Sequence, residues 1–312
     1  MHRKPRRLAT AGTGAWCAIC ALGVFTAPTA GQPADSPEQL PRVEADDHST
    51  LELQITPGVW LPRLGGEIKL GETGAARQIG FEDELDLNGL EPTFNGELSL
   101  RSDNGRGWSV LLSGFSFSTD NDGQFTGGRA ADFGSLTVNP GDSYRAEFEF
   151  DSMAAEVGLV TIPLVDSLDG DHGSMNPNHH NQTTLLRVSP HVGVRYVSIE
   201  QELSLPGSGQ PRERESERWF ATYVGGDVMM RFDTPTAIPL VRSLTLEGAF
   251  AAGPAISGSG FIWQVRGGLT LNFSESAGMQ IGYRLVELDL EQNDFEIDGG
   301  LQGLFIAGRV TF

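Results

Sequence analysis

The sequence predicts an all-β fold, a closed antiparallel transmembrane β-barrel of about ten strands within a range of roughly 8–12. Segments in which apolar and polar residues alternate recur from residue 51 to the C-terminus. Such alternation indicates strands, because successive side chains of a strand point to opposite faces. No run of ~20 apolar residues follows the N-terminal region, so spans by helices are not expected. The abundance of glycine, 40 residues in 312, also suits a chain of strands and turns.

The clearest alternation lies at 261–273. One face carries only apolar or small side chains, and it begins with Phe261 and ends with Phe273. From Gln264 onward the other face carries polar or small residues, including Arg266. Aromatic residues at both ends of an apolar face are typical of the girdles at the two membrane interfaces.

The remaining strands follow the same pattern with turn residues between them. The closing segment, 301–312, places Leu304, Ile306, Val310 and Phe312 on one face. The other predicted strands are 51–61, 93–101, 108–118, 144–160, 186–196, 220–232, 244–250 and 279–290. If the first strand leaves the periplasm, the connections 62–91, 120–142, 202–215, 254–260 and 292–300 face outward.

The segment 144–160 changes phase part-way. Its apolar residues stand at even positions from Tyr144 to Phe150 and at odd positions from Met153 onward. If the apolar face meets lipid throughout, this shift predicts a β-bulge near Ser152.

The N-terminal region predicts export. Residues 1–31 combine a basic start, an Ala/Gly-rich apolar stretch and small residues, as in a secretory signal peptide. Residues 32–50 predict a flexible periplasmic leader, and the barrel occupies 51–312. Both cysteines, Cys17 and Cys20, lie in the signal, so disulfides are not expected. The formal charge of −19 argues against nucleic-acid binding.

Two C-terminal stretches carry a resemblance. Gly282-Tyr283-Arg284 with Asp289, then Leu301-Gln302-Gly303-Leu304 and the terminal Phe312, resemble the closing hairpin of small, largely uncharacterised bacterial single-chain outer-membrane β-barrels. The resemblance implies outer-membrane location, contact with outer-membrane lipid, and Phe312 as a signal read by the barrel-assembly machinery. It implies no activity.

If the apolar faces meet lipid, the opposite faces fill the lumen with charge. We expect a lumen charge set made of Glu97, Arg101, Glu147, Glu149, Glu156, Arg187, His191, Arg195, Asp227, Arg231, Glu247, Arg266, Arg284, Glu287 and Arg309. A bore of about ten strands is little wider than one that side chains fill. The set is therefore interpreted as a neutralising network that plugs the lumen, and the alternative is a charge-lined channel for small solutes.

Other candidate sites are weaker. The loop 166–180 holds Asp and His residues that favour divalent metals, but its spacing matches no metal motif. The acidic run 82–86 lacks the spacing of a calcium loop. We expect no metal, no cofactor and no enzymatic activity, because no histidine falls at a predicted outer rim. The predicted protein is a monomer with a structural or surface-interaction role; a narrow channel is the second hypothesis and a rim enzyme the third. A soluble β-sandwich is the rival fold.

Overall fold

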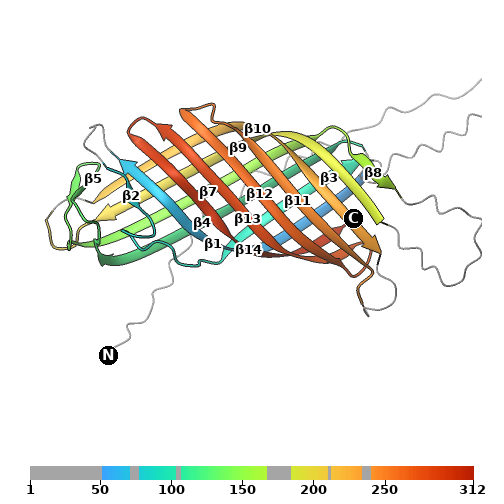
Figure 1. The fold of residues 1–312 in the computed structure, drawn as a ribbon, viewed down its shortest axis with the longest axis horizontal. Helices are drawn as coiled ribbons and strands as arrows, with labels where there is room; N and C mark the ends of the chain where they lie inside the picture. Colours follow the sequence, from blue (N-terminus) through green and yellow to red (C-terminus); the bar gives the residue numbers. More distant parts are fainter. Residues whose placement is uncertain (1–50, 71–76, 103–106, 167–183, 210–211, 234–239) are drawn as a thin grey trace, which may run out of the picture. The chain divides into compact units, whose positions relative to one another are not determined.

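The computed structural model describes residues 51–70, 77–102, 107–166, 184–209, 212–233 and 240–312. The predicted signal peptide and leader lie outside these residues. The chain forms ten long antiparallel strands that close into a barrel, as predicted (Figure 1). In this part of the chain no helix is long and apolar enough to cross a membrane.

Closure comes from pairing between the first and last strands. β14 runs antiparallel to β1, in register from Gln54↔Thr311 to Leu70↔Phe295. The barrel strands are β1 (Leu51–Leu70), β3 (Thr93–Ser102), β4 (Ser109–Gln124), β7 (Ser143–Gly158), β9 (Thr184–Ser204), β10 (Glu213–Asp233), β11 (Ser243–Pro254), β12 (Ser259–Asn272), β13 (Ala277–Gln292) and β14 (Phe295–Thr311). Each is paired to the next around the ring. Backbone groups are therefore paired on both sides, as a membrane-spanning sheet requires.

Four short strands lie at the two ends. β2 (Ile79–Gly80), β5 (Ala131–Phe133) and β6 (Leu136–Val138) lie at one end, which we call distal (Figure 1). β8 (Ile162–Asp166) and the C-terminus lie at the other, which we call proximal.

Several strands extend farther toward the distal end than the sequence predicted. β1 continues to Leu70, β4 to Gln124 and β9 to Ser204, and β10 begins at Glu213. The predicted outward connections 62–91 and 202–215 are therefore partly strand, and only Asn293 and Asp294 separate β13 from β14. The apolar outer row of each of these strands ends before the strand does. Strand bounds predicted from that row were therefore too short.

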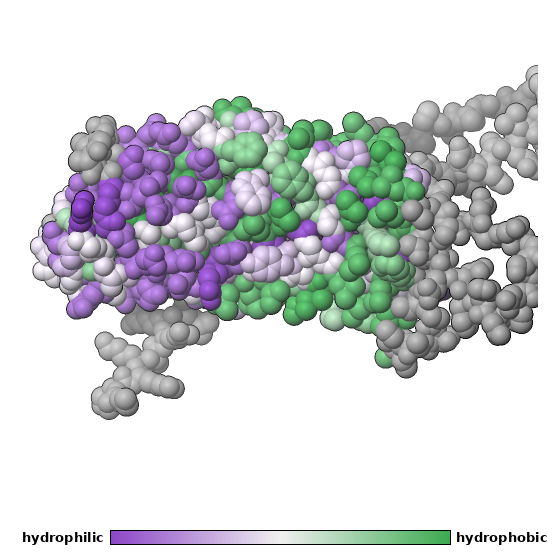
Figure 2. Space-filling view, in the orientation of Figure 1, coloured by the Kyte–Doolittle hydropathy of each residue, from purple (hydrophilic) through white to green (hydrophobic). Residues whose placement is uncertain are grey.

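The outer surface has two parts of opposite character. Figure 2 shows apolar residues toward the proximal end and polar residues toward the distal end. The switch occurs within single strands. On β9, Val192 and Val194 are followed on the same face by Ser198 and Glu200. We call the proximal part, with its apolar outer face, the membrane half, and the rest the distal half.

The interior has the reverse arrangement. In the distal half the inward side chains form an apolar core that includes Trp60, Phe117, Phe148, Trp219 and Phe295. In the membrane half the inward side chains are mostly polar. Strands β1, β4, β7, β9, β10, β13 and β14 therefore exchange their apolar face as they leave the membrane half, because water replaces lipid outside.

This exchange corrects the interpretation of the segment 144–160. β7 pairs with β4 and β9 without any register shift, so the predicted bulge near Ser152 is wrong. Phe148 and Phe150 are inside the barrel at 0% and 1% exposed, whereas Met153 is 61% exposed outside. The strand is regular, and only the apolar side changes.

Loops close the distal mouth with apolar side chains. The turn after β2 buries Phe81, Leu85 and Leu87, and the β5–β6 hairpin buries Phe133 and Leu136. All join the same core as the barrel wall. The acidic run 82–86 thus belongs to a turn that inserts Leu85 into the barrel.

Candidate functional site: the polar lumen of the membrane half

The structure brings most of the predicted lumen charge set together on the inner face of the membrane half. These side chains alternate with lipid-facing apolar residues on eight strands, so the strand period alone places them in one interior. The residues on this inner face are Glu97, Arg101, Glu156, Arg187, His191, Arg195, Asp227, Arg231, Glu247, Arg266, Arg284 and Arg309.

The expectation is wrong for Glu147, Glu149 and Glu287. On β7 the inward side chains are Tyr144, Ala146, Phe148 and Phe150. Glu147 and Glu149 alternate with them and therefore face outward. On β13, Glu287 stands between buried Val286 and Leu288 and also faces outward. All three lie in the distal half, where water is outside and the apolar side chains are inside.

A polar cavity of about 100 Å³ occupies the proximal part of this lumen. Its wall includes Gly107, Trp108 and Thr161, which lie at the proximal end of the barrel. Deeper in, charged side chains from β3, β7, β10, β11, β12 and β14 line it. Beyond them lies the apolar core of the distal half, so the cavity ends blind.

Two ion pairs cross the lumen. Arg266 on β12 donates to the Glu97 carboxylate on β3, on the far side of the ring. Arg309 Nη1 lies 2.9 Å from Glu247 Oε1. Gln280 donates to the second oxygen of Glu247 at 2.8 Å. Buried carboxylates with charged and neutral donors are the arrangement that low-dielectric surroundings require.

His191 lies between two carboxylates. Its Nδ1 is 3.3 Å from Asp227 Oδ2, and its Nε2 is 3.5 Å from Glu156 Oε2. Tyr223 donates its hydroxyl to Glu156 Oε1 at 2.7 Å. Both ring nitrogens of His191 therefore face acids, which leaves neither directed at a serine or threonine hydroxyl as a general base would be.

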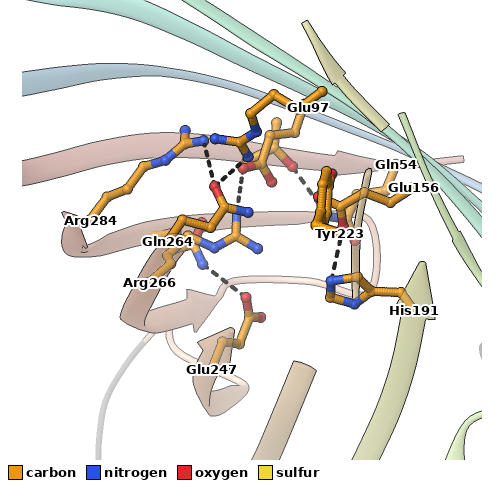
Figure 3. Close-up of polar contacts among 12 residues, drawn as sticks. Gln54, Glu97, Glu156, His191, Tyr223, Glu247, Gln264, Arg266 and Arg284 are labelled. Atoms are coloured by element: carbon orange, nitrogen blue, oxygen red, sulfur yellow. Dashed lines mark hydrogen bonds and ion pairs between the residues drawn. The ribbon is translucent and has the colours of Figure 1, made fainter. Parts of the chain in front are cut away.

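Two arginines meet at one amide. Arg284 donates to Oε1 of Gln264 at 3.3 Å (Figure 3). Arg195 donates to the same oxygen. The Arg284 guanidinium carbon also lies 5.4 Å from the Trp60 ring centroid and 5.0 Å from that of Phe115. These rings belong to the distal core, so Arg284 marks the boundary between the polar lumen and the apolar plug.

Within the described ranges, no group of three or more His, Cys, Asp or Glu side chains is placed to hold a metal ion. The Asp/His loop singled out in the sequence lies mainly outside the described residues. The sequence also missed Tyr223 as a lumen residue. The alternation of β10 does predict this position, since Tyr223 lies four residues before Asp227 and so on the same face of the strand.

Comparison with known proteins gives likenesses of fold only. No protein-family profile and no curated protein matches the chain. Among solved structures, the outer membrane protease OmpT from Escherichia coli matches at 7% identity with a TM-score of 0.37, covering 84% of this chain and 97% of that one. The attachment invasion locus protein Ail of Yersinia pestis matches at 12% identity with a TM-score of 0.33, covering 84% of this chain and 98% of that one.

The transport unit of the autotransporter AIDA-I from Escherichia coli matches at 10% identity with a TM-score of 0.33, covering 87% of this chain and 92% of that one. Similarity this low assigns no activity to the chain, whose own strand pairing and apolar outer band define its architecture. The fold is a closed antiparallel β-barrel of ten long strands with an apolar outer band.

Proposed function

We propose that the protein is a non-conducting outer-membrane barrel that anchors a polar distal half at the cell surface. The observation that carries the proposal is the exchange of apolar faces along seven of the ten long strands, β1, β4, β7, β9, β10, β13 and β14. An apolar outer band is stable only against lipid, and a polar outer face over an apolar core is stable only in water.

The blocked lumen supports the absence of conduction. From the proximal end, the polar lumen ends at Arg284, and Trp60 and Phe115 lie directly against that side chain. The apolar core continues from there to Phe133 at the distal mouth. Ions would have to cross this core without water, which costs far more free energy than a hydrated pore.

The distal outer surface supports a surface-interaction role. Acidic side chains dominate it on neighbouring strands, with Glu147 opposite Glu202 and Glu149 opposite Glu200 on β7 and β9. Arg212, just before β10, pairs with Glu202, and Arg214 on β10 pairs with Glu200. The proposed protein is a monomer that presents this face, with outer-membrane lipid around its other half.

Conductance in planar bilayers tests the blocked lumen. We expect the purified mature chain to insert without stable current steps. Discrete, reproducible steps would overturn the proposal and favour a narrow channel for small solutes. A shift in gel mobility between unheated and heated samples confirms that the inserted protein was folded.

Surface labelling tests the orientation. The mature chain has no cysteine if cleavage follows residue 31, so single cysteines can be introduced cleanly. Ser118→Cys lies on the outer face of the distal half, and Ser274→Cys lies in the proximal turn after β12. On intact cells, an impermeant maleimide should label the first and not the second. The opposite pattern would place the distal half in the periplasm.

A further inference from the structure

A small chamber lies at the inner end of the lumen. It measures about 20 Å³ and is lined by Glu97, Ser113, Gln264, Arg266 and Arg284, among others. It shares several wall residues with the larger proximal cavity, including His191. A volume of roughly 10–15 Å³ on this scale holds one water, so the chamber has room for a single water-sized particle.

The carboxylates around this chamber already have partners. Glu97 pairs with Arg266, and Asp227 faces His191. Glu156 accepts from Tyr223 and also faces His191. None of these three carboxylates lies within ion-pair distance of Arg195 or Arg284.

Those two arginines lack an anionic contact. Arg195 and Arg284 are 2% and 6% exposed, and the acceptor they share is the neutral oxygen of Gln264. Nη1 of Arg195 has no hydrogen-bond partner among the described residues. Aromatic faces supply part of the compensation, since Arg195 lies over Tyr223 and Arg284 over Trp60.

We propose that the inner chamber binds one monovalent inorganic anion of halide size, held by Arg284 and neutralising the Arg195–Arg284 pair. Two buried guanidinium groups share one neutral amide oxygen, so neither has an anion in contact and their positive charges repel. Burying such charges away from water costs free energy. A water molecule satisfies a donor but brings no charge. A halide beside Arg284, which lines the chamber, brings the opposite charge, and larger anions such as phosphate exceed the chamber.

Halide-dependent stability tests the proposal on the full mature chain folded in detergent micelles. Unfolding is followed at equal ionic strength in sodium chloride and in sodium gluconate, whose anion is too large for the chamber. At a chloride concentration 100 times Kd, the equilibrium constant for unfolding should fall about a hundredfold. Equal stability in both salts at all concentrations would overturn the proposal.

Gln264→Glu distinguishes this chamber from any other halide site. The new carboxylate lies where the two arginines meet, so the variant should lose the chloride dependence and be as stable in gluconate as the unmodified protein in chloride. Gln124→Glu, the same change on the exposed distal part of β4, should keep the dependence. A Gln264→Glu protein that still responds to chloride would refute the assignment.

Bromide gives a direct measurement that does not depend on any variant folding. Crystals of the unmodified protein grown in bromide should show an anomalous peak within hydrogen-bond distance of the Arg284 guanidinium. Water alone at that position would refute the proposal.

Discussion

Removing the Arg266 side chain tests two roles of the lumen charges separately: stabilising the fold and blocking the passage of ions. Arg266 crosses the barrel to Glu97, and the side chains are only 22% and 13% exposed. In Arg266→Ala, Glu97 keeps its place without its counter-charge. Breaking a buried pair in this way destabilises a protein by about 3–5 kcal/mol. We expect a loss of that size in the free energy of unfolding.

Guanidinium unfolding in lipid vesicles measures the loss, and a second variant checks its cause. Glu97→Gln combined with Arg266→Ala removes the unpaired charge, so most of the lost stability should return. If the double variant is as unstable as Arg266→Ala alone, the damage comes from lost packing and the ion-pair reasoning is refuted.

Conductance of the same variant tests where the lumen is blocked. If charges alone formed the plug, as the sequence suggested, alanine at Arg266 or Arg284 would raise conductance. The structure adds an apolar core beyond these residues, with Trp60 and Phe115 at its edge. We therefore expect Arg266→Ala to remain non-conducting, and stable current steps in this variant would contradict the apolar plug.

Three further predictions test the two halves of the barrel. Val194→Arg should cost about 2–4 kcal/mol in lipid, whereas Ser198→Arg on the same face of β9 should cost little, and equal losses in vesicle unfolding would contradict the membrane boundary. Phe148→Ala should cost about 3–5 kcal/mol, because it opens a cavity in the distal core, and a loss below 1 kcal/mol would argue against tight packing there. In the water-exposed distal half, burial and then the charge of Glu200 raise the pKa of Glu149, so its ionisation destabilises the fold. Glu149→Gln should therefore increase stability at neutral pH, and the gain should vanish as pH falls below the ordinary carboxyl range; a gain that persists in acid would refute this cause.

The inward arginines show how far alternation can locate a site. Arg266 and Arg284 were placed in the lumen because each lies opposite an apolar outer row, and the structure puts both there. Alternation says nothing about partners, however. Arg266 meets Glu97, 169 residues away in the chain, while Arg284 meets Gln264, and strand order and tilt decide which of them face each other.

The sequence by itself determined that this chain forms about ten strands with alternating faces, because a period of two and the turn residues are local properties. Closure into a barrel depends on the pairing of β1 with β14, which the structure shows. The sequence did not determine which face is inside. On β7 the set from Tyr144 to Phe150 and the set from Met153 onward are both apolar, yet one packs in the core and the other lies on the outer surface. Only the tertiary structure decided this, because the apolar side of a strand depends on whether lipid or water surrounds the closed barrel at that height.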